Sequence, residues 1–226
     1  DDPRLPEMFF PAWMTAVLRH GRSTAATELA LPLSPHGIHR QADNLTLYYA
    51  DRGQTILGEQ GYVGDSVMLG WGASTLSHNL VVVNDGEQTK AGRVPSLRLM
   101  ATSPRVSVVE ASSTAYAYAG CGEYRRLTAL LKGPGAETVA VDIFRVRGGA
   151  KHAYQVFSDL AASDAQDGAR EFAGLAMPPE PPLPDFGGSV ASEHIFGLRD
   201  AVGVDDPPAV WQATWRQADR SYRLRM

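Results

Sequence analysis

Short segments of alternating apolar residues recur along most of the chain, and they constrain its fold more than any other feature of the sequence. Val, Leu, Ile, Tyr and Thr dominate these segments, and Gly- or Pro-containing stretches separate them. No segment keeps a helical apolar period over three turns with matching caps. The pattern predicts an all-β fold, a large antiparallel β-sandwich of the supersandwich type with few or no helices. The predicted strands are residues 16–20, 27–33, 44–49, 54–59, 78–84, 96–100, 105–111, 124–131, 138–146, 152–157, 209–215 and 221–226.

The strand pattern also predicts how the 226 residues are organised. We expect one β-sandwich domain over residues 1–226, which is long enough to bury a sizeable core. Its parts would be an irregular entry segment, core strands, a Pro-rich surface excursion and closing strands, at residues 1–15, 16–160, 162–190 and 191–226. The chain opens without a signal-peptide pattern and ends inside a strand-like segment, so we expect both ends to lie within a longer polypeptide.

Charge and cysteine content narrow the function classes. A formal net charge of −4 gives no electrostatic reason to expect nucleic acid as a partner. A single cysteine, Cys121, rules out an internal disulfide framework. No apolar run approaches the length of a membrane span. A solvated face is the default interpretation of the adjacent Arg125 and Arg126.

The chemistry-bearing side chains gather in residues 34–43, just ahead of a predicted strand. His36, His39, Gln41 and Asp43 lie within this stretch. On an extended chain, residues two apart share a face, so His39, Gln41 and Asp43 would line up. Imidazole transfers protons and binds metals near neutral pH, and a carboxylate can orient it. The residues alone leave a loop role for His36 and a turn-capping role for Asp43 equally open.

Four more candidates follow along the chain. Glu59 ends a predicted strand, where a solvated glutamate is the ordinary interpretation. His78 opens an apolar strand, where a buried structural histidine is the ordinary interpretation. Tyr62 and Trp71 lie in a Gly-rich stretch, where aromatic rings can stack on sugars or simply pack. The chain contains no HExxH, GxSxG or CxxC motif.

Four ordered pieces of sequence resemble the C-terminal β-domain of the heparinase II/III-like polysaccharide lyases. Residues 9–19 are similar to the family's F-P-x-x-G-x-x-V-L-R strand, with Met14 where glycine is usual. Residues 39–47 resemble H-x-H-x-D-x-L-S, and residues 56–62 resemble L-L-x-D-x-G-x-Y. Residues 74–86 resemble S-T-x-x-H-N-T-V-V-V-D-G.

The resemblance implies a function and a missing partner domain. Family members degrade acidic polysaccharides such as heparin, heparan sulfate and alginate by β-elimination. Their active site lies between an N-terminal α/α-toroid and the β-sandwich, and the toroid supplies the tyrosine acid/base. We therefore expect a toroid upstream, an acidic polysaccharide substrate, a periplasmic or secreted location, and no activity from this fragment alone.

The resemblance also implies a role for each candidate residue. His39 would be the catalytic histidine, and Gln41, Glu59 and His78 occupy the positions of the family's metal ligands, which makes Zn²⁺ the implied cofactor. Asp43 and His36 would support the site, and the residue types suit Arg40, Tyr62 and Trp71 for substrate binding.

Two departures from the family pattern leave two interpretations of the metal site. Gln41 replaces a histidine, and an amide is a poorer zinc ligand than imidazole. Glu59 replaces an aspartate and lengthens the arm. The alternative to zinc is a hydrogen-bonded knot of Gln41, Glu59 and His78. On a regular hairpin Glu59 faces about Asn44, roughly 10 Å from Gln41, so a bulge or curl near residues 40–44 must bring them together.

Two functions from different classes remain on this reading. The first is the β-domain of a uronan lyase. The second is a structural or carbohydrate-binding module of the same fold, with the metal site decayed at Gln41.

Overall fold

The computed structural model describes most of the first two thirds of the chain and parts of the rest. The described residues are 7–33, 41–58, 72–89, 95–114, 116–134, 137–157, 169–173, 212–217 and 220–225. They belong to two compact units, Asp1–Phe157 and Ser158–Met226. The boundary lies close to the predicted end of the core strands at residue 160. One domain over residues 1–226 stays a prediction.

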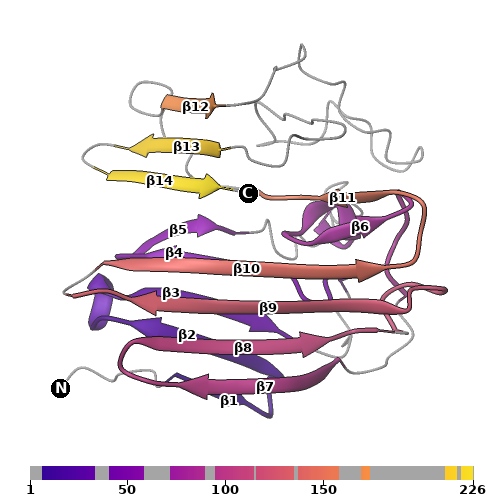
Figure 1. Ribbon diagram of the computed structural model, residues 1–226, viewed down its shortest axis with the longest axis horizontal. Coiled ribbons are helices and arrows are strands. Elements are labelled where there is room, and N and C mark those ends of the chain that lie inside the picture. Colours follow the sequence, from indigo (N-terminus) through magenta and orange to yellow (C-terminus); the bar gives the residue numbers. More distant parts are fainter. Residues whose placement is uncertain are drawn as a thin grey trace. The chain divides into compact units, whose positions relative to one another are not determined.

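A five-stranded antiparallel sheet forms one layer of the first unit (Figure 1). Its order is β1-β2-β3-β4-β5, so each strand pairs with the next along the chain. In β3 the side chains of Thr27, Leu29 and Leu31 are buried and those between them are not, which is the two-residue period of a half-buried strand. The strands are β1 (Met8–Phe10), β2 (Thr15–His20), β3 (Thr27–Pro32), β4 (Tyr48–Asp51) and β5 (Gln54–Leu57).

A four-stranded antiparallel sheet forms the other layer, in the order β10-β9-β8-β7. Its strands are β7 (Ser96–Thr102), β8 (Val106–Ser112), β9 (Glu123–Lys132) and β10 (Thr138–Arg147). A two-stranded ribbon pairs β6 (Val81–Val83) with β11 (His152–Tyr154). Two 3₁₀ turns, η1 (Ser23–Ala25) and η2 (Thr75–Ser77), lie between strands.

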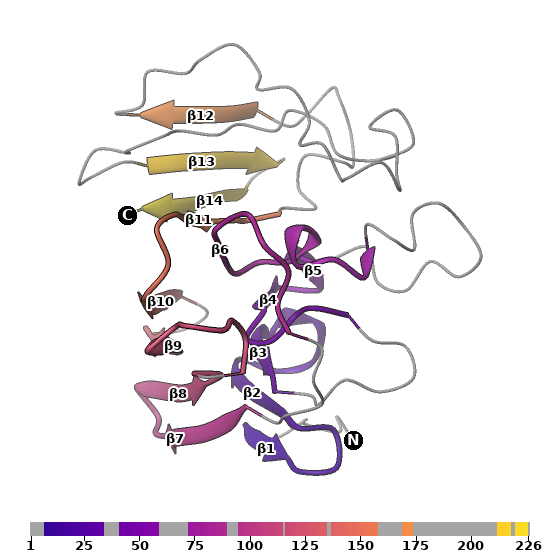
Figure 2. The ribbon, with the colours of Figure 1, turned by 90° about the vertical axis from the view of Figure 1, so that its right-hand side faces the viewer.

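The two sheets face each other across one hydrophobic core. Figure 2 shows the layers edge-on, with β7–β10 on one side and β1–β5 on the other. Leu18 and Leu29 from the first sheet and Val109 and Leu130 from the second are all fully buried in the same cluster. Burying the apolar face of each sheet against the other is what stabilises such a sandwich. The all-β antiparallel sandwich predicted from the sequence is confirmed.

The second unit contains a three-stranded antiparallel sheet, β12-β13-β14. Its strands are β12 (Ala169–Ala173), β13 (Gln212–Gln217) and β14 (Arg220–Arg225). The last two agree with the predicted closing strands. Residues 169–173 differ from the prediction, because they lie in the expected Pro-rich surface excursion and nevertheless pair with β13.

The start of the chain also differs from the prediction. Residues 8–10 form β1 and pair with β2, where the sequence indicated an irregular entry segment. Three prolines in residues 1–15 suggested irregular structure, but none lies within β1, so its backbone N–H groups remain available for pairing.

The hairpin of β4 and β5 differs from the predicted strands at residues 44–49 and 54–59. Its turn lies at Arg52 and Gly53, both with positive φ (50° and 77°), as a two-residue type I′ turn requires. Asp51 then pairs with Gln54, and a register shift between Tyr49 and Ala50 places Leu57 opposite Tyr49. The strand β4 begins at Tyr48 and not at residue 44.

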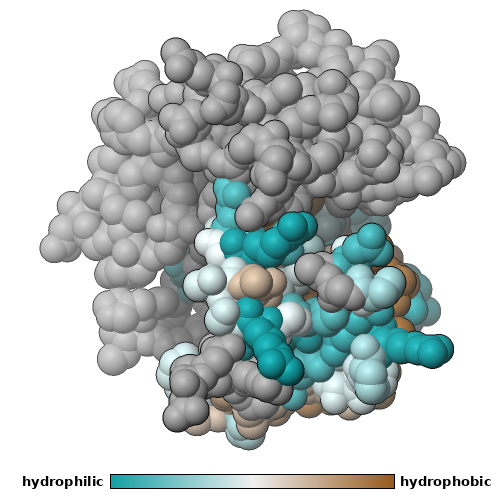
Figure 3. Space-filling model, turned by 90° about the vertical axis from the view of Figure 1, so that its left-hand side faces the viewer, coloured by the Kyte–Doolittle hydropathy of each residue, from teal (hydrophilic) through white to brown (hydrophobic). Residues whose placement is uncertain are grey.

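The outer face of the second sheet carries several exposed apolar side chains. Val106, Leu131 and Val139 form a cross-strand row on β8, β9 and β10, and each is more than a third exposed. Leu99 and Ile143 are exposed to a similar degree. On the side of the molecule in Figure 3, the coloured surface is largely hydrophilic, with hydrophobic residues toward its right-hand margin. Among the described residues no helix is long and apolar enough to span a membrane.

Candidate functional site

His78 is the best-defined member of the predicted site. It follows η2 with an extended backbone, φ −120° and ψ 155°. The carboxylate of Glu87 accepts hydrogen bonds from the Thr75 backbone N–H and hydroxyl, which fixes the start of η2. The His78 side chain is fully buried. A buried imidazole on a pinned turn has a defined orientation, which a metal ligand or a structural bond needs.

The partners of the His78 ring determine its tautomer. Its Nδ1 lies 2.8 Å from the Ser74 carbonyl oxygen and 3.0 Å from the Ser77 hydroxyl. A carbonyl oxygen only accepts, so Nδ1 carries the proton and donates it to Ser74. In the neutral ring the lone pair is then on Nε2. A backbone carbonyl that accepts from Nδ1–H is a usual way in which proteins orient a histidine so that its Nε2 can bind a metal.

Gln41 lies where that lone pair points. Its Oε1 is 3.3 Å from His78 Nε2. The backbone next to Gln41 is bonded to the chain just before η2, because Ala42 N–H donates to the Ala73 carbonyl. Two acceptors at this distance need a proton or metal ion between them, or the Gln41 amide turned by 180° to offer its NH₂ group. The Gln41–His78 contact was predicted in both interpretations of the metal site.

The separation of this pair suits two corners of a tetrahedral zinc site. With ligand distances of about 2.0–2.1 Å, neighbouring ligand atoms lie about 3.3–3.4 Å apart. The observed distance between Nε2 and Oε1, 3.3 Å, agrees with this and also with a long hydrogen bond. Among the described residues no three His, Cys, Asp or Glu side chains form a metal-binding group. Glu59, the third predicted ligand, lies outside the described residues.

A turn brings the predicted segments together. Thr46 N–H donates to the Asp43 carbonyl, and Leu45 has a φ of 64°. The chain therefore curls just after Gln41, close to the place where the sequence required a bulge or curl. Asp43 contributes its backbone carbonyl to this turn, and its supporting role in the site stays a prediction. The other predicted site residues, His36, His39, Arg40, Tyr62 and Trp71, lie outside the described residues.

Asn79, next to His78, links three stretches that approach the site. Its side-chain NH₂ donates to the Leu47 carbonyl at 3.1 Å and to the Gly58 carbonyl at 2.8 Å. Its Oδ1 accepts from Phe157 N–H at 2.6 Å. No role for Asn79 was predicted from the sequence. A buried amide inside an apolar strand was the available signal, because such a group must be fully hydrogen-bonded.

Arg126 is the second residue that sequence reasoning missed. The sequence favours a solvated face for Arg126, but its side chain is fully buried and is among the largest buried side chains. Burial alone would lower its pKa, but the charge of Asp142 raises the pKa above its ordinary value, so the guanidinium stays protonated. The alternation of β9 was the missed signal, since Arg126 shares its parity with the buried Tyr124 and Leu130.

Gln88 is a third buried polar residue that supports the segments carrying Gln41 and His78. The Gln88 side chain accepts from Asn44 N–H and donates to the Asn44 carbonyl and the Tyr124 hydroxyl. Tyr124 in turn donates to the Val81 carbonyl at 2.7 Å. Burial raises the pKa of Tyr124 well above its ordinary value, which keeps the phenol a donor. The turn after Gln41 and the strand after His78 are therefore both bonded to the second sheet.

Comparisons with known proteins agree with this architecture. The heparan sulfate lyase HepC from Pedobacter heparinus is 18% identical with a TM-score of 0.51, over 73% of this chain and 26% of that one. A heparinase III structure is 18% identical with a TM-score of 0.50, over 70% of this chain and 26% of that one. At this identity the likeness shows the fold alone. The chain spans only about a quarter of the length of these structures.

The sequence family is established more directly. No curated protein matches the chain. The model of the family described as "Heparinase II/III-like, C-terminal" matches residues 2–175, which is well over half of the chain. The match includes all four motifs that indicated the resemblance. The chain therefore belongs to the heparinase II/III-like C-terminal family.

Proposed function

We propose that this chain is the β-sandwich domain of a polysaccharide lyase that cleaves a uronic-acid polysaccharide, of the heparan sulfate or alginate kind, by β-elimination. The family match over residues 2–175 carries the proposal. The buried His78, oriented by Ser74 and directed at Gln41, supports it. A helical toroid elsewhere in the full polypeptide would supply the remaining machinery, so the isolated chain would be inactive.

The substrate sets what the site must do. A base removes the proton beside the uronate carboxylate, and the freed electron pair forms a carbon–carbon double bond. The bond to the neighbouring sugar's oxygen breaks, and that oxygen takes a proton from an acid. The enolate-like dianion formed on the way needs positive or hydrogen-bonding groups around the carboxylate. In this proposal His39 is the group of this chain that faces the uronate.

Gln41, Glu59 and His78 form the scaffold behind His39 in this proposal. Zinc bound there would supply a positive charge that fixes the three side chains. Without metal, the Gln41–His78 contact itself would hold these side chains in place. Arg40, Tyr62 and Trp71 would contact the acidic chain, by charge and by stacking on sugar rings. A charged polysaccharide does not diffuse across a membrane, so the enzyme would act in the periplasm or outside the cell.

The second candidate is a non-catalytic structural or carbohydrate-binding module. The observation that favours it is Gln41 itself, which replaces an imidazole and lies at hydrogen-bond distance from His78. In that case the fold is retained and the site is only a structural knot.

Turnover of uronans tests the lyase proposal. The full-length protein is incubated with heparan sulfate, alginate and related polymers, and the ultraviolet absorbance of unsaturated uronate is followed. We expect absorbance to rise with one of them, and His39→Ala to abolish the rise without unfolding the protein. His152→Ala is the matched control, because that exposed imidazole bonds only to the Gly148 carbonyl in the described contacts and is remote in sequence from the motifs. No rise on any polymer would favour the non-catalytic module.

Metal content separates the two interpretations of the scaffold. If Gln41 is a ligand, the purified protein holds zinc near one equivalent, and Gln41→His binds it at least about 10-fold tighter. If Gln41 is only a hydrogen-bond partner, the wild-type protein holds no zinc at equilibrium dialysis. Zinc content can be measured whether or not the protein cleaves a polysaccharide.

A further inference from the structure

The fully buried Arg126 uses every donor that a guanidinium has. Nε and Nη2 donate to the two oxygens of Asp142, each at 2.8 Å. Nη2 also donates to the Tyr154 hydroxyl at 3.4 Å. Nη1 donates to the carbonyls of Leu45 and Asn79, at 2.6 and 2.5 Å. All five N–H groups therefore have an acceptor, which is the condition for burying this charge without a large penalty.

The two carbonyls bonded by Nη1 belong to the segments that carry the site. Leu45 lies in the turn directly after Gln41 and Asp43. Asn79 directly follows His78. A single nitrogen bonds both carbonyls, so their separation is fixed by the geometry of one planar group. These segments are otherwise remote in sequence from β9, by 81 and 47 residues.

We infer that Arg126 is a positioning residue of the candidate site, which sets the backbone of the Gln41 and His78 segments relative to each other. The inference rests on the proposed function for its catalytic consequence. Its structural part rests on the hydrogen bonds alone. Asn79 extends the same arrangement to the Gly58 carbonyl, the last described residue before Glu59.

The orientation of the guanidinium is itself determined by the second sheet. Asp142 on β10 holds it in a bidentate pair, and the Phe144 ring lies 5.0 Å from its central carbon. The Tyr154 hydroxyl donates to the same Asp142 carboxylate at 2.7 Å. A lysine ammonium has three donors and no plane, so it cannot hold Asp142 and both carbonyls in this geometry.

Neighbouring arginines provide a matched test. Arg126→Lys alters the positioning group, and Arg125→Lys makes the same change one residue away on the opposite face of β9. In the full-length protein labelled with ¹⁵N at the histidine rings, the His78 signals are identified by their loss in His78→Ala. We expect Arg126→Lys to shift the His78 ring signals and lower kcat by about 10–100-fold at little-changed KM. Arg125→Lys should change neither.

The outcomes are distinct. A folded Arg126→Lys protein with unchanged His78 signals and unchanged kcat overturns the inference. If Arg126→Lys does not fold, Asp142→Asn decides on the same two readouts, because it removes the charged partner that orients the guanidinium toward the two carbonyls. If the wild-type protein has no lyase activity, the proposed function fails, and the His78 signals alone still decide whether Arg126 positions the site.

Discussion

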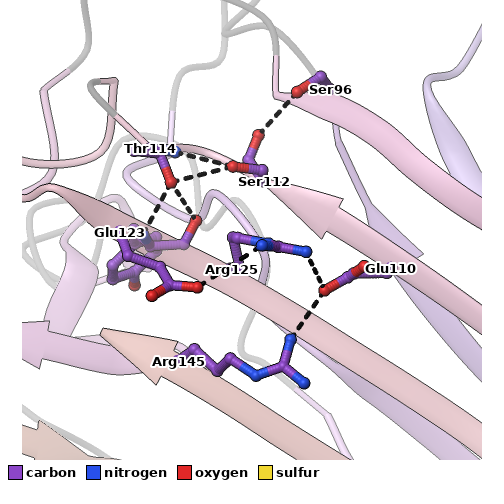
Figure 4. A network of polar contacts seen from close by, with 8 residues as sticks. Ser96, Glu110, Ser112, Thr114, Glu123, Arg125 and Arg145 are labelled. Carbon is purple, nitrogen blue, oxygen red and sulfur yellow. Dashed lines mark hydrogen bonds and ion pairs between the residues drawn. The ribbon is translucent and has the colours of Figure 1, made fainter. Parts of the chain in front are cut away.

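The two faces of the sheet β10-β9-β8-β7 use the same residue type in opposite ways. On the inner face, Arg126 is fully buried with five satisfied donors. On the outer face, Arg125 and Arg145 share one oxygen of Glu110 and are 34% and 44% exposed (Figure 4). Glu110 itself is 11% exposed, but water and salt reach both of its arginine partners, whereas the buried charge of Arg126 depends wholly on its partners. Burial and partner geometry therefore decide how much each arginine of this sheet contributes to stability.

The largest effect should follow from removing the inner arginine. Arg126→Met removes the guanidinium that neutralises Asp142 and bonds two carbonyls, so we expect the free energy of unfolding to fall by about 3–5 kcal/mol. Urea denaturation measures it. Adding Asp142→Leu should recover only part of the loss, because the Leu45 and Asn79 carbonyls still lack the Arg126 donor. A loss below about 1 kcal/mol from Arg126→Met would mean that the buried arginine stabilises the protein no more than an exposed one.

Removing the inner amide should have a smaller effect. Asn79→Ala deprives the Leu47 and Gly58 carbonyls and the Phe157 N–H of partners, and we expect a loss of about 1–3 kcal/mol. Hydrogen exchange should also show weaker protection at Phe157 N–H than in the wild type. Unchanged protection there would mean that water replaces the Asn79 side chain and that the inner face is less closed than we describe.

Alkaline pH should weaken the inner side selectively. Burial is the largest cause of the raised pKa of Tyr118, Tyr124 and Tyr154. In the unfolded chain a tyrosine ionises at about pH 10, while these stay protonated in the folded protein. Their stabilisation is therefore complete below about pH 10 and is lost as pH rises above it, by up to about 1.4 kcal/mol per pH unit for each. Denaturation midpoints from about pH 9 to 11 measure the slope, and Tyr154→Phe should make it shallower.

The smallest effect belongs to the outer face. Arg145→Ala removes one half-exposed partner of Glu110, and we expect a loss of about 0.2–1 kcal/mol that shrinks further in high salt. The same urea titration, run at low and high salt, measures both numbers. A loss as large as that of Arg126→Met would show that exposure does not separate the two faces.

The sequence predicted most strands, but it misplaced the segment that matters most to the site. Residues 44–47 alternate like a strand, yet Leu45 has a φ of 64° and begins no strand. Leucine rarely adopts such a φ, so nothing local indicated the turn. The turn is held by distant groups: Leu45 by Arg126, and Leu47 N–H by the Asn79 carbonyl. The site's curl is therefore a tertiary feature.

By itself, the sequence determined the all-β class, most of the strands and the family to which the motifs belong. These follow from two-residue alternation, turn residues and short motifs, which are all local. Only the tertiary structure decided that Gln41 meets His78, and that Arg126 is buried against the segments carrying both. The physical reason is that these bonds join residues 37 to 81 positions apart, and a hydrogen bond to a distant carbonyl leaves no trace in local pattern.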